Sequence, residues 1–230
     1  DFSNKYQIKA FILAGGLGKR LMPITKTLPK ALVKVRGEPI IVQIIKKLKN
    51  NGYKDLIISV NHLANKIKNF LGNGKKLGVK ISYVTENQPL GTAGSLSLIP
   101  KKILPQNLLI LNCDLYTDLN FEDLVNFHFI KGVDATLCVK EKRIKQKFGI
   151  IETNKEKIVD IKEKPIVKYF INAGIYIIDT KLIKLVPKNT NYLMTDFFEK
   201  IIKKKIKHQV FPILEKWDDI GTIKDLKKLS

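Results

Sequence analysis

A glycine-rich segment near the N-terminus carries the residue types that bind phosphate. Gly15, Gly16 and Gly18 directly follow a short apolar run, and glycine lets backbone N–H groups curl around phosphate oxygens. Two cations, Arg20 and Lys30, come after the glycines at fixed distances. The segment therefore predicts a phosphate site with positively charged side chains beside it.

Two common nucleotide-binding loops do not fit this segment. The dinucleotide pattern needs glycine where Leu21 stands, and a Walker loop needs glycine where Leu13 stands. A glycine-rich turn alone is weak evidence, because many such turns only connect two elements. The full pattern G-G-x-G-x-R-L-x-P, followed by P-K, is much more specific.

Asp114 is the carboxylate whose place in the sequence suggests chemistry. It follows the apolar run 108–113, and in open α/β sheets ligands bind at the carboxyl ends of the strands. An aspartate after a strand is more often a turn or helix cap, so its position alone does not decide its role. The three histidines stand singly without ligand spacing, which argues against a zinc site. Cys113 and Cys138 are expected to be buried thiols.

The elements that must position these residues alternate between strands and helices in the first half of the chain. This alternation predicts an α/β, Rossmann-like fold, with a mixed, mostly parallel sheet and helices on both faces. Strands are expected at 8–14, 56–60, 79–84 and 108–113, and helices at 39–52, 63–71 and 92–99. The second half is richer in strands, expected at 135–139, 148–152, 158–161 and 171–178, with a basic helix at 195–206.

Size and charge limit the classes of protein. The 230 residues, 44% of them hydrophobic, suffice for one good core, so we expect one domain at 8–230 after a linker remnant at 1–7. The sequence has no run of about twenty apolar residues and no signal peptide, which predicts a cytoplasmic protein without a membrane partner. A net charge of +21 would ordinarily suggest nucleic acid. Arginine, however, occurs at only three positions. Proteins that recognise bases in the grooves of DNA depend on arginine, so we expect no nucleic-acid partner.

Further short motifs follow the glycine loop in a fixed order. They are the segment 86–94 (E-N-Q-P-L-G-T-A-G), 112–114 (N-C-D), 163–165 (E-K-P), 172–174 (N-A-G) and 217–221 (W-D-D-I-G). With these motifs the chain resembles the sugar-1-phosphate nucleotidylyltransferase family through most of residues 8–226. One departure is Lys19, which stands where the family usually has threonine.

The resemblance implies a nucleotide-diphospho-sugar transferase fold and a set of roles. Nucleotide binding falls to Ala14, Gly15, Gly16, Gly18, Glu86, Gly91 and Thr92, and Mg²⁺ binding to Asp114 and Asp219. Arg20, Lys30 and Lys164 would act on the reacting phosphates, while Gly149, Glu163, Asn172 and Gly174 would hold the sugar. Asp218 is an alternative to Asp219 that the motif spacing does not favour. A sugar phosphate is already nucleophilic, so the implied chemistry needs charge neutralisation more than a general base.

Base and sugar are less sharply indicated. Glu86 favours guanine, because a carboxylate matches the adjacent N1–H and 2-amino donors, whereas uracil or thymine suits an amide better. The amino-acid sequence of these motifs is similar to that of bacterial guanylyltransferases of the mannose-1-phosphate and glucosamine-1-phosphate type. Similarity to proteins of nonulosonic (legionaminic) acid synthesis implies glucosamine or N-acetylglucosamine 1-phosphate and N-terminal CBS regulatory domains. Mannose and heptose 1-phosphate stay open, as does a homo-oligomer.

Three other classes of protein compete with this interpretation. A uridylyl- or thymidylyltransferase would share the whole site except for the base contacts. A non-catalytic regulatory homologue would have lost the metal carboxylates or the loop arginine, and both are present. A glycosyltransferase of related topology would show Asp-x-Asp, but Leu115 and Tyr116 follow Asp114.

Overall fold

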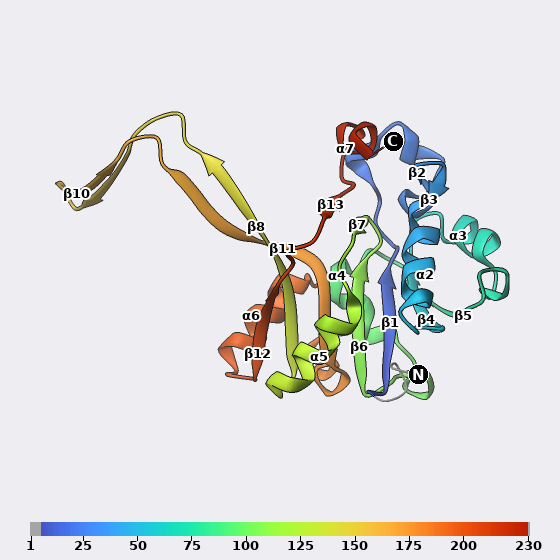
Figure 1. The fold of residues 1–230 in the computed structure, drawn as a ribbon. Helices are drawn as coiled ribbons and strands as arrows, with labels where there is room; N and C mark the ends of the chain where they lie inside the picture. Colours follow the sequence, from blue (N-terminus) through green and yellow to red (C-terminus); the bar gives the residue numbers. More distant parts are fainter. Residues whose placement is uncertain (1–5, 230) are drawn as a thin grey trace.

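A seven-stranded mixed sheet forms the centre of the computed structural model, which describes residues 6–229 (Figure 1). The strand order is β12-β8-β11-β6-β1-β4-β5. The strands are β1 (Ile8–Leu13), β4 (Asp55–Val60), β5 (Lys80–Thr85), β6 (Asn107–Asn112), β8 (Ala135–Lys145), β11 (Ile166–Asp179) and β12 (His208–Pro212). The pairs β6–β1, β1–β4 and β4–β5 are parallel, and β11 runs antiparallel to both β6 and β8. The expected α/β fold with a largely parallel sheet is confirmed.

Two hydrophobic cores lie on the two faces of the sheet, because successive side chains of a strand point to opposite sides. In β1, Ala10 and Ile12 join one core and Phe11 joins the other. In β6, Leu109 and Ile110 divide in the same way. Strands that are covered on both faces are therefore typically apolar at every position. This pattern predicted the strands in the parallel half of the sheet.

The helices cover both faces. They are α2 (Ile40–Asn50), α3 (Ala64–Leu71), α4 (Gly91–Gly94), α5 (Phe121–Lys131), α6 (Met194–Lys203) and α7 (Ile223–Leu229). Residues of α2, α3 and α5 belong to the first core, and residues of α4 and α6 to the second. Helix α5 was not predicted, although Asn120 caps it through the amide N–H of Glu122 and Gly132 ends it in the left-handed conformation.

Several elements differ in extent from the prediction. The helix expected at 92–99 is one α-helical turn followed by a 3-10 helix, Ser95–Leu98. Strands β7 (Leu115–Thr117), β13 (Trp217–Asp219), β2 (Lys34–Val35) and β3 (Glu38–Pro39) form two small sheets that the sequence did not indicate. Of the proposed linker remnant 1–7, residues 1–5 lie outside the described residues, and Tyr6 stacks on Phe129 of α5 at 4.3 Å. None of the described helices is both long and apolar enough to cross a membrane.

A β-ribbon projects from the body of the molecule, and we call residues 141–170 the arm (Figure 1). Strands β8 and β11 were expected to stop at 139 and begin at 171, but their pairing continues outward from Ile171–Lys140 to Ile166–Lys145. Two further strands, β9 (Ile150–Asn154) and β10 (Lys157–Lys162), form a separate two-stranded sheet at its end. Beyond the core the two strands stay together through backbone hydrogen bonds. The prediction relied on runs of apolar residues, which mark buried segments, so it placed the strand ends at the edge of the core.

Candidate active site

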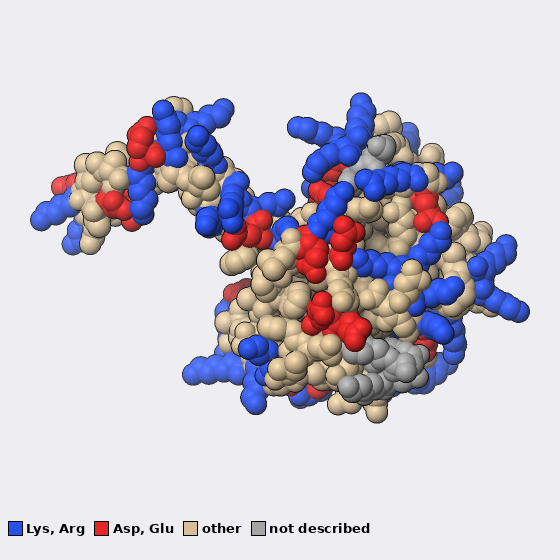
Figure 2. Space-filling view, in the orientation of Figure 1, with Lys and Arg blue, Asp and Glu red and all other residues tan. Residues whose placement is uncertain are grey.

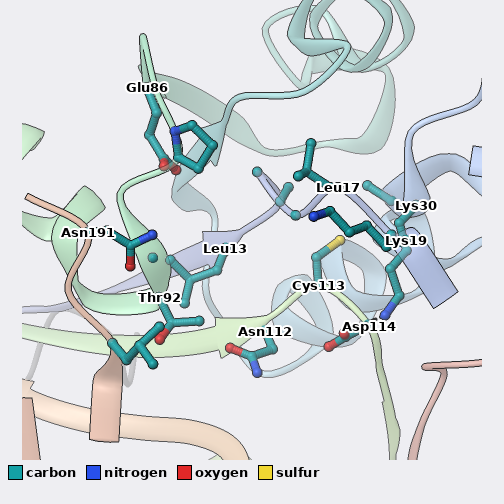
Figure 3. Close-up of a pocket in the computed structure, with 18 residues that line it drawn as sticks. Leu13, Leu17, Lys19, Lys30, Glu86, Thr92, Asn112, Cys113, Asp114 and Asn191 are labelled. Atoms are coloured by element: carbon teal, nitrogen blue, oxygen red, sulfur yellow. Dashed lines mark hydrogen bonds and ion pairs between the residues drawn. The ribbon is translucent and has the colours of Figure 1, made fainter. Parts of the chain in front are cut away.

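A cavity of about 410 Å³ lies at the carboxyl ends of β1 and β6 (Figure 3). Nine of the predicted site residues line it: Ala14, Gly15, Gly16, Gly18, Lys30, Glu86, Gly91, Thr92 and Asp114. Strands β1 and β6 pair in parallel, so their carboxyl ends bring the glycine loop and Asp114 to one edge of the sheet. Arg20, Asp219 and all the residues expected to hold the sugar do not line it.

The glycines of the loop have different structural roles. Gly18 has a φ of +62°, and a Cβ there would lie 2.8 Å from the Thr25 side chain, whose hydroxyl also donates a hydrogen bond to the Gly18 carbonyl. A Cβ on Gly15 would lie 2.8 Å from Glu86 Oε1. Gly16 has nothing within 4 Å of its Cβ position. Gly15 and Gly18 are thus required by packing, whereas Gly16 leaves room for a ligand against its backbone.

Lys30 and Asp114 form a close ion pair on the cavity wall. The Nζ–Oδ2 distance is 2.6 Å, and the two side chains are 14% and 24% exposed. The other carboxylate oxygen, Asp114 Oδ1, is buried and has no hydrogen-bond partner among the described residues. Buried acceptors are nearly always satisfied in folded proteins, so this oxygen is available to a ligand or cation.

Asp219 lies beside this pair. Ile220 donates its backbone N–H to the Asp114 carbonyl at 2.8 Å, which fixes the C-terminal segment against the end of β6. Arg20 reaches Asp219 at 3.9 Å. Burial, followed by repulsion from the Asp114 carboxylate, raises the pKa of Asp219 above its usual range. Asp218 instead pairs with Lys228 at 3.1 Å, so Asp219 is the aspartate that the fold places beside Asp114.

This arrangement predicts that Asp219→Asn makes the metal-free protein more stable at neutral pH. The raised pKa means that folding disfavours the ionised side chain, and the amide removes that cost. The exposed Arg20 pair that is lost contributes little. The wild-type contribution is unfavourable above the folded pKa and disappears as the pH falls to the ordinary value of 3.8. Thermal unfolding in EDTA across pH checks this, and a variant less stable than wild type at pH 7 would contradict it.

Glu86 lies at the end of the cavity away from the lysines (Figure 3). Its Oε1 accepts a hydrogen bond from Ser59 Oγ at 2.6 Å, and its Oε2 accepts one from the Leu90 backbone N–H at 3.0 Å. The side chain is therefore held in place by the strand β4 and by its own loop. A carboxylate oxygen has two lone pairs, so each oxygen keeps one acceptor position.

A distant segment closes this end of the cavity. The Tyr192 carbonyl accepts hydrogen bonds from Ala93 and Gly94, and the Tyr192 N–H donates to the Leu90 carbonyl at 2.8 Å. Thr92 Oγ1 accepts from the Met194 N–H at 2.8 Å. These contacts place the Asn191 side chain in the cavity wall near Glu86 (Figure 3). Asn191 was not among the predicted site residues, because no motif around it indicates the contact.

Two of the residues expected to hold the sugar lie in β11 where it leaves the core. Asn172 Oδ1 accepts a hydrogen bond from the Gly174 N–H at 2.9 Å. Gly174 has a φ of +70°, and a Cβ there would lie 2.6 Å from the amide nitrogen of Asn112. Its lack of a side chain thus makes room for Asn112, which lines the cavity.

The other two, Gly149 and Glu163, lie in the arm, away from the cavity, together with Lys164. Lys164 Nζ is 3.6 Å from Glu163 Oε1, and both side chains are mostly exposed. Gly149 lies against Glu163, whose Oε2 is 3.0 Å from the position of a Cβ. The structure therefore groups Gly149, Glu163 and Lys164 with one another and does not bring them to the cavity.

Comparison with protein families gives a match to the family model described as nucleotidyl transferase, over residues 9–230. A mannose-1-phosphate guanyltransferase of Gibberella zeae is 32% identical over 226 residues. A UTP–glucose-1-phosphate uridylyltransferase of Synechocystis is 30% identical over 237 residues. Each alignment covers 95% of this chain, but only 62% and 61% of the two relatives. The chain thus spans about three fifths of the length of these relatives.

Solved structures share the fold. HddC from Yersinia pseudotuberculosis aligns with a TM-score of 0.75 at 25% identity, over 96% of this chain and 97% of that one. A Bacillus anthracis protein crystallised with sucrose, and assigned as a glucose-1-phosphate thymidylyltransferase, aligns with a TM-score of 0.79 at 25% identity. This alignment covers 96% of the chain and 93% of the neighbour. The likeness therefore extends over nearly the whole chain.

Proposed function

Because the chain belongs to the nucleotidyl transferase family, we propose that it transfers a nucleoside monophosphate from an NTP to a sugar 1-phosphate. An oxygen of the sugar phosphate forms a bond to the α-phosphorus, the bond from that phosphorus to the bridging oxygen breaks, and pyrophosphate leaves. The observation that carries this proposal is the cluster of Lys30, Asp114 and Asp219 beside the open backbone of Gly16. The named activities of the relatives, guanylyl and uridylyl transfer to hexose 1-phosphates, support it.

Residues of the chain would offset the electrostatic repulsion between the nucleoside triphosphate and the sugar phosphate. Backbone N–H groups of the glycine loop would bind the triphosphate, and Lys30 would meet the charge that develops at the α-phosphate. Arg20 offers paired donors that would stabilise the departing pyrophosphate. No residue is needed as a general base, since the attacking oxygen already carries charge.

The donor set fits a magnesium ion that is held partly by substrate. Among the described residues, no group of three or more Asp, Glu, His or Cys side chains could hold a metal ion. Mg²⁺ commonly takes one or two carboxylates together with phosphate oxygens and water. Asp114, through its unpartnered Oδ1, and Asp219 are the residues that would hold it. When bound, the ion would supply charge neutralisation and alignment of the phosphates.

For the base we propose guanine, read by two side chains. The free lone pairs of Glu86 can accept from N1–H and the 2-amino group. The Asn191 amide, which makes no hydrogen bond in the described part of the chain, can donate to O6. Pyrophosphate release from GTP, UTP, dTTP, CTP and ATP with a panel of hexose 1-phosphates tests the whole proposal. Faster turnover of UTP or dTTP than of GTP would contradict guanine, and release from no NTP would contradict the activity.

Asn191→Ala is expected to lower kcat/KM for GTP by about tenfold, the effect of one net hydrogen bond. ITP has the same O6 and N1–H but lacks the 2-amino group, so the variant should lose the same factor with ITP. Glu86→Gln should instead reduce the preference for GTP over ITP. Steady-state kinetics with both nucleotides check this, and an Asn191→Ala loss confined to GTP would contradict the contact to O6.

For the sugar phosphate we propose glucosamine, N-acetylglucosamine or mannose 1-phosphate, held by Glu163, Lys164 and Asn172. Glu163 and Lys164 lie in the arm, so this proposal requires the arm to move towards the cavity. Lys164→Ala is expected to raise KM for the sugar phosphate by about tenfold or more, with KM for GTP changed by less than twofold, because one charged hydrogen bond is lost. Lys168→Ala, another exposed lysine of the arm, is the matched control. Equal effects of the two substitutions would show that Lys164 has no specific role.

A further inference from the structure

A second cavity, of about 200 Å³, borders the first core and is lined by residues of α2, β7 and α5. Its apolar lining consists of buried members of that core, namely Ile44, Leu111, Leu115 and Phe121. Among the described residues, it shares no lining residue with the active-site cavity. An engineered apolar cavity of about 150 Å³ binds benzene, so this one has room for an aromatic ring.

Lys47 of α2 brings a charge to the wall of this cavity. Its ammonium group donates a hydrogen bond to the Thr117 carbonyl at 2.6 Å and lies 5.6 Å from the centre of the Phe121 ring. Burial lowers the pKa of Lys47, and the carboxylates of Asp118 and Glu215 oppose this shift only in part. In the described part of the chain the ammonium group forms no ion pair, so two of its three donors are available to an anion. Asp118 also lines the cavity, but it is exposed, and water screens its charge.

The surroundings of the cavity favour an anion as well. Tyr116, which also lines it, has two cations over its ring, Arg36 at 5.3 Å and Lys216 at 5.1 Å. Basic side chains predominate on the visible face of the molecule (Figure 2), in line with the net charge of +21. This charge raises the concentration of small anions near the surface. Lys47 then distinguishes the cavity from the rest of the surface, because its half-buried charge is poorly screened.

We propose that this cavity is a second ligand site, separate from the active site, for a small organic anion with a flat apolar body. The apolar body would pack on Phe121 and Leu115, and the anionic group would accept hydrogen bonds from Lys47. Apolar walls with a few placed polar groups are typical of sites for small molecules. Aromatic carboxylates are the simplest ligands of this class.

An occupant of this site would act on the strand that carries Asp219. Strand β7, which forms one wall of the cavity, pairs with β13, and this pairing places Leu115 opposite Asp219 and Thr117 opposite Trp217. The site is therefore placed to regulate the metal carboxylates, a role that rests on the proposed function. Trp217 is buried and is the single tryptophan of the chain, so its fluorescence reports on β13.

Titration of the 230-residue chain with benzoate, against chloride at the same ionic strength, tests this inference without nucleotide. Nuclear magnetic resonance should show saturable shifts of amides in α2 and β7, with a Kd of about 1 mM, and Trp217 fluorescence should change with the same Kd. Benzamide, which has the same shape without the charge, should bind about tenfold more weakly, and so should benzoate to Lys47→Met, because a charge-assisted hydrogen bond is lost. Lys216→Met is the matched control, since it removes a cation that lies over Tyr116 but does not line the cavity. Its affinity for benzoate should stay within about twofold of wild type.

Each other outcome would overturn the proposal. Shifts confined to the glycine loop would place benzoate in the active-site cavity, and equal affinity for benzamide would show that no cation binds the ligand. Saturable binding without a change in Trp217 fluorescence would refute the link to β13. Should Lys47→Met lose its fold, Ile44→Phe, which fills the cavity and keeps the lysine, decides the same question by whether binding is lost. A chain without transferase activity would contradict the proposed function and leave these measurements intact, so the two failures are distinguishable.

Discussion

Asp114→Asn is expected to reduce kcat about 10³-fold, the size of effect seen when one electrostatic contact to the reacting group is lost. The carboxylate has one oxygen paired with Lys30 and one buried oxygen without a partner. The amide removes the charge that would hold Mg²⁺ and leaves Lys30 without a counter-ion. The dependence of rate on magnesium concentration should therefore shift to higher concentration, in addition to the fall in kcat.

Asp218→Asn is the matched control for this experiment. Asp218 is a neighbour of Asp219 in sequence, but its carboxylate binds Lys228 and does not face the cluster. We expect its rate to stay within about twofold of wild type, as for a surface pair, and Asp219→Asn to behave like Asp114→Asn. The variants should bind GTP in the absence of metal, which calorimetry can verify. Wild-type turnover in Asp114→Asn would show that this carboxylate does not hold the metal.

Lys30→Met is expected to lower kcat by about 10²-fold to 10³-fold, with a smaller change in KM for the nucleotide. Lys30 lines the cavity and its side chain is 14% exposed, so water screens its charge poorly. A cation that meets charge developing in the transition state acts on kcat more than on ground-state binding. Methionine keeps an unbranched side chain, one atom shorter, and removes the ammonium group with its charge and its hydrogen-bond donors.

The competing explanation is that Lys30 serves only to neutralise Asp114. In that case Lys30→Met would act mainly through the carboxylates, and added magnesium would restore the rate. We expect saturating magnesium to leave most of the defect. Lys26→Met, an exposed lysine of the same segment, controls for loss of one positive charge near the loop. Restoration by magnesium would contradict a direct role of Lys30 at the phosphate.

The sequence by itself determined the part of the site that depends on which residues directly follow each strand. Apolar runs predict buried parallel strands, and the carboxyl ends of such strands meet at one edge of the sheet. Gly16, Glu86 and Asp114 lie just after the ends of such strands, and the structure places them around one cavity together with Lys30. Asp219 needed the family motif as well, because nothing in its own neighbourhood distinguishes it from Asp218.

Only the tertiary structure decided which distant segments meet. Asn191 lies at the end of the cavity near Glu86 because backbone hydrogen bonds join residues 90–94 to residues 192–194. No pattern of side chains in the sequence indicates this pairing. The arm carries Glu163 and Lys164 away from the cavity because β8 and β11 continue their pairing beyond the core. Backbone groups are the same in every residue, so their pairing over long distances is set by the geometry of the whole fold, whereas side-chain periodicity reports only on burial nearby.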